Sequence, residues 1–529
     1  MDSSIATPSR RTLLAAGALG TAALFGASAA QAAEAAPAPA DAAWDEEFDV
    51  IVVGAGIAGL TTAITVAREG DGASCLLIEK CESANGCSPV CDGDSMYHIE
   101  WDYLKTLNTL PNGELAVPED ILRVFAEGID ENLPWIKELG APEDKLTIKD
   151  PGTAFPEYQE IDAKPWYSAF WFTGANEEPE YQHVYRFFEH VRATQLADAI
   201  DFRPNTALES LVQAEDGTIE GVVAAGRRYK ANKGVVMCIG GFEHNPEMLH
   251  CFFGEGEAIS WAGSGNTGDG FPIVARIGAD FWGMHDCAGF WMAQRDLDNT
   301  VWTNGTYACH KHKMYGITVG QNGRRFYMDW DGHKSVDEIN LEWTLDMGLH
   351  VGSRHGLMQF GGEWTRLPMP TKGWFIFDQA ALEAGAFPAD RSDDPVAEGY
   401  LLVADTLEEL AEQCGMSEPS ELVKTVGHWN ALCEAGEDLA FYRPVDTLTK
   451  VETGPFYAQL CVPTMLNTDG GPKRTARAEV VGVDGEVIPH LYAAGEFGSV
   501  WGHLYQGCGN VAECMVFGRI AARNVCGVA

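Results

Sequence analysis

The stretch FDVIVVGAGIAGLTTAITVAREG, residues 48–70, decides the fold. Residues 49–53 form an apolar, β-branched run of the kind that makes a buried parallel strand. The run Gly54-Ala55-Gly56-Ile57-Ala58-Gly59 then leads into an amphipathic helix. The first glycine permits a tight turn, the second lets a diphosphate approach the backbone, and the third packs the helix against the strand. We expect the diphosphate at the helix N-terminus, where unpaired N–H groups favour anions.

A second apolar run, CLLIEK at 75–80, follows this helix. It places Glu79 at the end of the next strand, where a carboxylate accepts hydrogen bonds from ribose hydroxyls, and Lys80 lies beside it. A glycine motif alone is weak evidence, but strand, turn, helix, second strand and acid occur here in the expected order. The sequence therefore predicts an α/β, Rossmann-like domain, a parallel sheet with helices, that binds a dinucleotide.

Three glycine-bearing segments much further along the chain favour FAD over NAD. They are KGVVMCIGGFEHN (233–245), SGNTGDG (264–270) and LYAAGE (491–496). A two-strand NAD site does not need contacts from segments this far along the sequence. FAD does need them, because its ribityl and isoalloxazine groups reach across the sheet. We expect further FAD contacts from these segments and from the start of the last helix, at Gly240, Gly241, Asn266, Thr267, Gly268, Asp269, Gly495, Glu496, Asn510 and Val511.

In this order the motifs resemble the fumarate reductase and 3-ketosteroid dehydrogenase family of flavoproteins. The resemblance is strongest at 48–80, 234–280 and 454–524, and the closing segment is most similar to exported flavin reductases of gut anaerobes. It implies an FAD-binding domain made of 47–290 and 449–529, with an α+β cap domain inserted at 291–448. It also implies a non-covalent FAD, since no segment matches a known flavinylation motif.

The resemblance argues against a dicarboxylate substrate. In fumarate reductases of this family, two histidines and an arginine hold the dicarboxylate. The corresponding positions in this sequence are Phe290, Asn467 and Gln506. A buried carboxylate without a cation costs several kcal/mol to desolvate. We therefore expect these three positions to contact a substrate other than fumarate.

The same comparison implies a proton donor in the cap. The family's proton donor lies eight residues beyond the arginine of the NGRRF turn, which is Arg325 here, and this position is His333. Fumarate reductases have arginine at this position, and ketosteroid dehydrogenases have tyrosine. Histidine titrates near neutrality, which suits a general acid. An exposed loop histidine is the alternative, and Tyr327 and Tyr315 are the reserve acids.

The stretch GHLYQGCGN, 502–510, carries a pair of donors. In 3-ketosteroid dehydrogenases a tyrosine and the backbone N–H of a glycine four residues later bind the steroid carbonyl, and Tyr505 and Gly509 have that spacing. Two donors on one oxygen stabilise the negative charge that develops there. The alternative is that Tyr505 only packs at the end of the cofactor helix.

Together these parts predict hydride transfer from reduced FAD to a C=C conjugated to a carbonyl, as in an enone, unsaturated lactone, steroid-like or acrylate substrate. Tyr505 and Gly509 would polarise the carbonyl, and His333 would protonate the α carbon. The same geometry run backwards is a ketosteroid-type dehydrogenation. A flavin electron-transfer protein without an organic substrate is the third alternative.

The N-terminus indicates export. Paired arginines, Arg10 and Arg11, precede the apolar run LLAAGALGTAALFGASAA, and Ala30-Gln31-Ala32 offers small residues for cleavage. We read 1–32 as a twin-arginine signal peptide and 33–46 as a linker, which places the protein at the extracytoplasmic face of the cell envelope. An ordinary secretory signal with two arginines is the alternative.

The composition limits the kinds of binding partner that we expect for this protein. The 529 residues carry a formal net charge of −41, which argues against nucleic acid, and no later run is long and apolar enough for an integral membrane span. There is no second nucleotide fingerprint for NAD(P)H. The sequence therefore predicts a small-molecule substrate and a separate electron carrier, either a cytochrome or a flavoprotein.

Three of the cysteines lie close together in the sequence. Cys81, Cys87 and Cys91 lie in the loop after the second strand, which in this family wraps the FAD, so Cys87, Ser88 and Cys91 are expected cofactor contacts. The spacing matches no standard cluster motif and lacks a fourth ligand. Thiols against the cofactor, a disulfide and an iron–sulfur cluster remain the alternatives, and no metal is predicted.

Overall fold

The computed structural model describes most of the chain from residue 43 onward. The described residues are 43–84, 94–110, 112–149, 166–175, 177–253, 259–260, 265–288, 291–295, 315–326, 372–387, 392–441, 443 and 445–528, with the backbone alone at 94, 149, 259–260, 291–295 and 462–464. The signal peptide expected at 1–32 and the linker as far as residue 42 lie outside this range. Within it, no helix combines the length and apolarity that crossing a bilayer requires.

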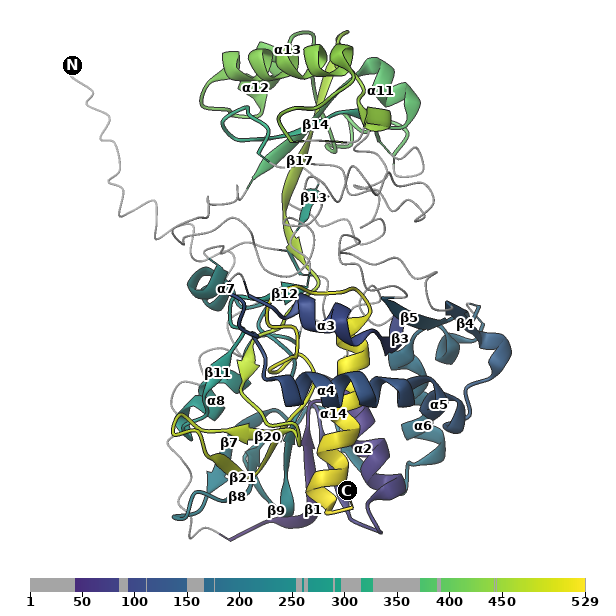
Figure 1. The fold of residues 1–529 in the computed structure, drawn as a ribbon, viewed down its shortest axis with the longest axis vertical. Helices are drawn as coiled ribbons and strands as arrows, with labels where there is room; N and C mark the ends of the chain where they lie inside the picture. Colours follow the sequence, from purple (N-terminus) through teal and green to yellow (C-terminus); the bar gives the residue numbers. More distant parts are fainter. Residues whose placement is uncertain are drawn as a thin grey trace, which may run out of the picture.

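The largest sheet of the described residues is built from both ends of the chain (Figure 1). Its parallel part has the spatial order β21 (Val487–Ala493), β9 (Arg227–Met237), β1 (Glu46–Val53), β2 (Cys75–Ile78) and β6 (Ile200–Arg203). Antiparallel strands extend it at β20 (Glu479–Val481), β8 (Ile219–Ala224) and β7 (Leu208–Gln213). The predicted α/β fold with a parallel sheet is confirmed.

Both faces of β1 are buried, as the apolar run at its centre predicts. Val50 and Val52 belong to the core on one face, and Ile51 and Val53 to the core on the other. The N-terminal helix α2 (Ile57–Glu69) and the C-terminal helix α14 (Gly509–Cys526) pack against each other over the first face (Figure 1). The two chain ends are therefore joined through one hydrophobic core.

Short elements pack around α14 and α2. They are α3 (Trp101–Leu107), α4 (Glu119–Gly128), the 3-10 turn η1 (Ile129–Glu131), α5 (Asn132–Glu138), α6 (Val184–Gln195) and the small antiparallel sheet β3 (Asp94–Ile99), β5 (Tyr167–Phe172) and β4 (Leu146–Lys149). Of these, β3, η1, α4 and α5 pack against α14, and α6 packs against α2. On the other side of the sheet lie α7 (Pro246–Phe253) and α8 (Gly270–Arg276) with two short ribbons, β11 (Phe281–Trp282) with β19 (Gly471–Pro472) and β12 (Cys287–Ala288) with β18 (Asn467–Thr468).

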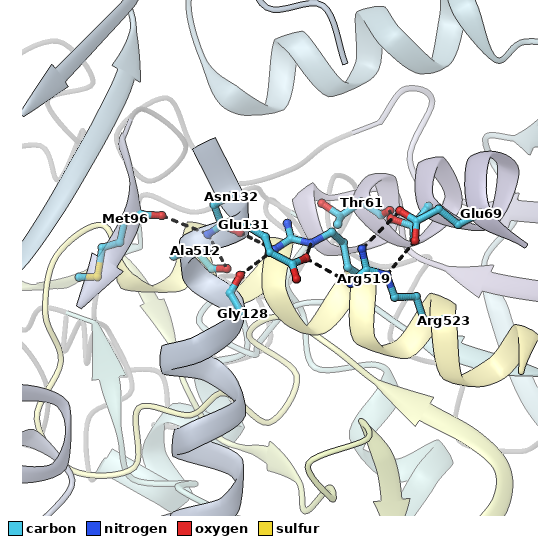
Figure 2. Close-up of polar contacts among 10 residues, drawn as sticks. Thr61, Glu69, Met96, Gly128, Glu131, Asn132, Ala512, Arg519 and Arg523 are labelled. Atoms are coloured by element: carbon cyan, nitrogen blue, oxygen red, sulfur yellow. Dashed lines mark hydrogen bonds and ion pairs between the residues drawn. The ribbon is translucent and has the colours of Figure 1, made fainter. Parts of the chain in front are cut away.

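A polar network fixes the C-terminal half of α14 to these elements (Figure 2). Arg519 is buried and donates to the Gly128 carbonyl at 2.9 Å and to Asn132 Oδ1 at 2.8 Å. Arg523, one turn further along, donates to Glu69 of α2 at 2.7 Å. Burial lowers the pKa of Arg519 to about 10, so the guanidinium stays charged at neutral pH. This half of α14 is thereby tied to both α2 and α4.

The second part of the molecule stands above this sheet (Figure 1). Its strands are β10 (Ile259–Ser260), β13 (Trp291–Arg295), β14 (Ile317–Gly320), β15 (Gly373–Asp378), β16 (Leu402–Ala404) and β17 (Phe456–Met465), and its helices are α11 (Gln379–Ala384), α12 (Leu407–Gln413) and α13 (Pro419–Ala435). β17 lies in the range expected for the second part of the FAD domain, 449–529, yet pairs with β13 and β15. The chain thus re-enters the lower part after β17.

Candidate functional site

A pocket opens where the parallel strands end and α2 begins. Its lining comes from seven separate stretches of the chain, and the predicted residues among it are Gly54, Gly56, Ile57, Ala58, Glu79, Lys80, Gly240, Asn266, Asp269, Gly495 and Glu496. Gly59, Gly241, Thr267 and Gly268 lie in the same turns, and Asn510 and Val511 begin α14. The fold therefore brings the dispersed glycine segments to one site.

The first glycine turn has no room for side chains. Gly54 has a φ of +94°, and a Cβ there would lie 2.3 Å from the Cys238 carbonyl oxygen. A Cβ on Gly59 would lie 1.8 Å from the Gly54 carbonyl oxygen. The described first turn of α2 also carries no acidic side chain, so its N–H groups suit an anion. This is a cradle that fits the diphosphate of a dinucleotide.

The acid at the end of β2 is oriented by backbone donors. Glu79 Oε2 accepts from the Ala55 amide at 2.8 Å, and Oε1 accepts from the Cys81 amide at 2.9 Å. Beside it, Lys80 Nζ donates to Thr267 Oγ1 at 2.7 Å and to Asp269 at 2.5 Å. The end of β2 is thus tied to the 264–270 turn across the pocket.

Several lining residues were not predicted from the sequence. They are Val53, Ile78, Thr206, Ala207, Leu208, Cys238, Ile239, Gly265, Gly270, Ile273, Ala494 and Cys514. The segment after β6 reaches the pocket because the Thr206 amide donates to the Glu79 carbonyl at 2.7 Å. It carries no glycine motif, so only the strand pairing of β6 with β2 places it there.

A buried polar network runs from the pocket to the start of α14. Asn266 donates to Glu243 at 2.5 Å, and Glu243 accepts from Thr468 Oγ1 at 3.1 Å. The next residue, Asp469, accepts from Asn467 Nδ2 at 3.1 Å and from Asn510 Nδ2 at 2.9 Å. Burial raises the pKa of Glu243, and raises the pKa of Asp469 well above its ordinary value. These acids therefore tend toward the neutral, protonated form.

The predicted donors Tyr505 and Gly509 are buried at the N-terminus of α14. The Tyr505 ring meets Trp501 edge-on at 5.4 Å, and its oxygen accepts from the Asn510 amide at 3.4 Å. The Gly509 amide donates to the Gln506 carbonyl at 3.1 Å. For Gly509 to bind a substrate carbonyl, that turn hydrogen bond must be exchanged. The two donors are close together, and their role stays a prediction.

Six predicted site residues fall outside the described residues. They are Cys87, Ser88, Cys91, Phe290, Tyr327 and His333. Their assignments as cofactor contacts, substrate contacts and proton donor therefore stay predictions. Among the residues that the structure describes, no group of histidines, cysteines and acids is arranged to hold a metal.

The parallel sheet, the glycine cradle and a pocket that draws on both chain ends define an FAD-binding oxidoreductase. The chain belongs to the FAD-binding domain family, which matches residues 49–511. FAD is therefore the cofactor, and the residues of the pocket fit it. The predicted family relationship is confirmed.

Individual relatives match between 61% and 97% of the chain. The chain is 29% identical to a digoxin reductase of Eggerthella lenta, over 97% of this chain and 95% of that protein. It is 30% identical to a 3-oxosteroid 1-dehydrogenase of Mycolicibacterium smegmatis, over 61% of this chain and 59% of that protein. In fold it resembles 3-ketosteroid delta1-dehydrogenase from Sterolibacterium denitrificans, with a TM-score of 0.70, 21% identity, and 92% and 100% of the two chains covered.

Proposed function

We propose that the protein is an exported flavoprotein reductase that adds hydride to a C=C conjugated to a carbonyl, with an enone, unsaturated lactone, steroid-like molecule or acrylate as substrate. Reduced FAD supplies the hydride when it is bound. The digoxin reductase similar to this chain over nearly its whole length supports the reductive direction. The proposed FAD is non-covalent, and its electrons come from a separate carrier, a cytochrome or a flavoprotein.

The observation that carries the proposal is a neutral substrate side next to the FAD pocket. Asn467 and Gln506 are almost inaccessible and present amides, and Tyr505 presents a phenol. The network of Glu243 and Asp469, which connects Asn467 to the pocket and reaches Tyr505 through Asn510, contributes acids rather than cations. Such a network stabilises a carbonyl by hydrogen bonds and offers no cation to a buried carboxylate.

Each proposed group has one task. The Tyr505 hydroxyl and the Gly509 amide donate to the carbonyl oxygen and stabilise the charge that develops on it. Gln506 and Asn467, with Phe290, contact the remainder of the substrate. His333 in the cap donates the proton to the α carbon, and Tyr327 is the reserve acid.

Oxidation of a ketosteroid is the second candidate. The similarity to a 3-oxosteroid 1-dehydrogenase favours it, and the same donors would serve, because hydride leaves from the same carbon that otherwise receives it. A flavin protein that only transfers electrons is the third. Export by the twin-arginine route is supported by the paired arginines before residues 13–30.

The test is a substrate screen with the full, FAD-loaded chain. Under anaerobic conditions, reduced methyl viologen is offered with cyclohex-2-enone, an unsaturated lactone, acrylate and fumarate, and an oxidised dye is offered with the saturated ketones. We expect viologen oxidation with the neutral carbonyl compounds and none with fumarate. Turnover only with the oxidised dye supports the dehydrogenase instead, and no turnover in either direction contradicts both enzyme proposals.

A further inference from the structure

The FAD pocket has an ion pair on its solvent-facing side. Lys80 Nζ lies 2.5 Å from Asp269 Oδ2, and both residues line the pocket. The Lys80 side chain is 29% exposed and the Asp269 side chain 50%, whereas Glu79, beside Lys80 in the chain, is buried. Because exposure rises from Glu79 to the ion pair, the pair lies at the rim of the pocket and Glu79 lies deeper.

Thr267 makes the ion pair part of a closed network of three side chains. Lys80 Nζ also donates to Thr267 Oγ1 at 2.7 Å, and Thr267 Oγ1 donates to Asp269 Oδ1 at 2.8 Å. Each of the three side chains is therefore bonded to the other two. Hydrogen bonds that involve charged groups are stronger than neutral ones, so the network holds the flexible Lys80 side chain across the rim.

The backbone on both sides of this network is held in place. On one side, the Glu79 amide donates to the Arg203 carbonyl at 3.0 Å. On the other side, the Gly268 amide donates to the Gly241 carbonyl at 3.2 Å. The rim therefore opens by rotation of side chains, above all of Lys80, whose four-carbon stem rotates freely once its bonds are broken.

We propose that the network of Lys80, Thr267 and Asp269 is a latch across the entrance of the FAD pocket, closed in both the free and the loaded protein. FAD enters and leaves only when the latch opens. A latch of this kind slows entry and release by the same factor, so it sets the rate of cofactor exchange and leaves the Kd unchanged. The inference depends on FAD binding and not on the identity of the substrate, so it is independent of the proposed function.

The alternative is that the two charged side chains act only through their charge on FAD. The diphosphate of FAD is anionic, so the loss of the Lys80 cation would then slow entry and speed release. The loss of the Asp269 anion would have the opposite effect on both rates. A latch predicts instead that either loss speeds both entry and release.

Entry and release are measured separately on the full chain. Entry is followed by the change in flavin fluorescence when the apoprotein is mixed with FAD in a stopped-flow instrument, and release by the recovery of free-FAD fluorescence after dilution of the loaded protein. Lys80→Met and Asp269→Ala should each raise both rate constants about threefold to fivefold, the size of one partly exposed ion pair. The Asp269 side chain caps no amide of α8, so its removal leaves that helix intact.

Lys473→Met is the matched control. Lys473 Nζ lies 2.5 Å from Asp280 Oδ2 in an ion pair that is also partly exposed, but the described lining of the FAD pocket includes neither residue. Its loss should leave both rate constants unchanged. Salt gives a second readout: raising KCl from about 50 mM to 500 mM should speed release from the wild type by screening the ion pair, and should do so less in Lys80→Met.

Several results would overturn the latch. These are unchanged rates in both variants, opposite changes in the two variants, an equal salt effect on release from the wild type and from Lys80→Met, or a wild type that does not release FAD on dilution. If Lys80→Met does not fold, Asp269→Ala decides. Faster entry with faster release then supports the latch, and faster entry with slower release assigns Asp269 to charge alone and overturns it.

Discussion

The two halves of α14 lie in one continuous helix but use buried charge in different ways. In the N-terminal half, Glu513 is paired with Arg474, and the neighbouring Cys514 lines the FAD pocket. In the C-terminal half, Arg519 binds the Gly128 carbonyl and the Asn132 amide oxygen (Figure 2). In the first arrangement, the pKa of the acid lies at about 7, so its charge changes near neutral pH. In the second, the cation donates to two neutral oxygens and also lies 3.6 Å from the Glu131 carboxylate. The difference indicates a helix that is adjustable at the site and fixed at its far end.

The largest effect is expected at Arg474. Its side chain pairs with Glu513, donates to the Ala493 carbonyl at 3.1 Å and lies 4.0 Å from the Phe517 ring, so it braces the turn whose Ala494 and Gly495 line the pocket. Arg474→Met should lower the free energy of unfolding by roughly 3–5 kcal/mol, because it leaves a buried acid without its partner. It should also weaken FAD binding, measured by fluorescence titration of the apoprotein.

The matched control removes both charges. Arg474→Met combined with Glu513→Leu should recover most of the stability, since an apolar pair of similar volume often replaces a buried ion pair. It should not recover FAD affinity, because the bond to Ala493 is still missing. Recovery of both would mean that the pair contributes only to packing.

Tyr505, which precedes the same end of the helix, should have the next largest effect. If its hydroxyl polarises the substrate carbonyl, Tyr505→Phe costs roughly 2–4 kcal/mol of activation barrier, a loss of about 30- to 10³-fold in kcat. Stopped-flow reoxidation of the reduced flavin by cyclohex-2-enone measures it. A rate equal to that of the wild type would assign Tyr505 to packing against Trp501.

At the far end, Arg519→Met should affect folding and not the cofactor. It removes two hydrogen bonds from a buried guanidinium, for which we expect a loss of roughly 2–3 kcal/mol in the free energy of unfolding. The Kd for FAD should stay within about twofold of the wild-type value. Arg523→Met, one turn away and partly exposed, is the control and should cost under about 1 kcal/mol. A clear loss of FAD affinity in Arg519→Met would remove the distinction between the two halves.

The glycine turns and strands were predictable because their requirements are local. Residues 48–70 specify a strand, a turn without room for side chains and a helix, and the structure has these as β1, Gly54 to Gly59 and α2. The buried contacts of Tyr103 with Gln506 and of Arg474 with Glu513 were not predictable, because each joins residues that are far apart in the sequence. No spacing rule indicates such a pair. The boundary of the cap was equally hidden, because the sequence of 456–465 does not indicate that β17 pairs with β15 of the cap.

The last prediction distinguishes the two halves of α14 by the pH dependence of stability. Burial raises the pKa of Glu513 to about 7, above its unfolded value near 4.3, so the native state binds more protons than the unfolded state between these values. The stability from this group is therefore complete below about pH 4.3 and is lost as pH rises through about 7. Glu513→Gln should flatten the dependence of unfolding free energy on pH in this window by about 1 kcal/mol per pH unit. Asp469 and Glu243 titrate in both proteins, so the difference between variant and wild type isolates Glu513. Equal slopes in urea titrations at several pH values would show that its charge is the same in the folded and unfolded states.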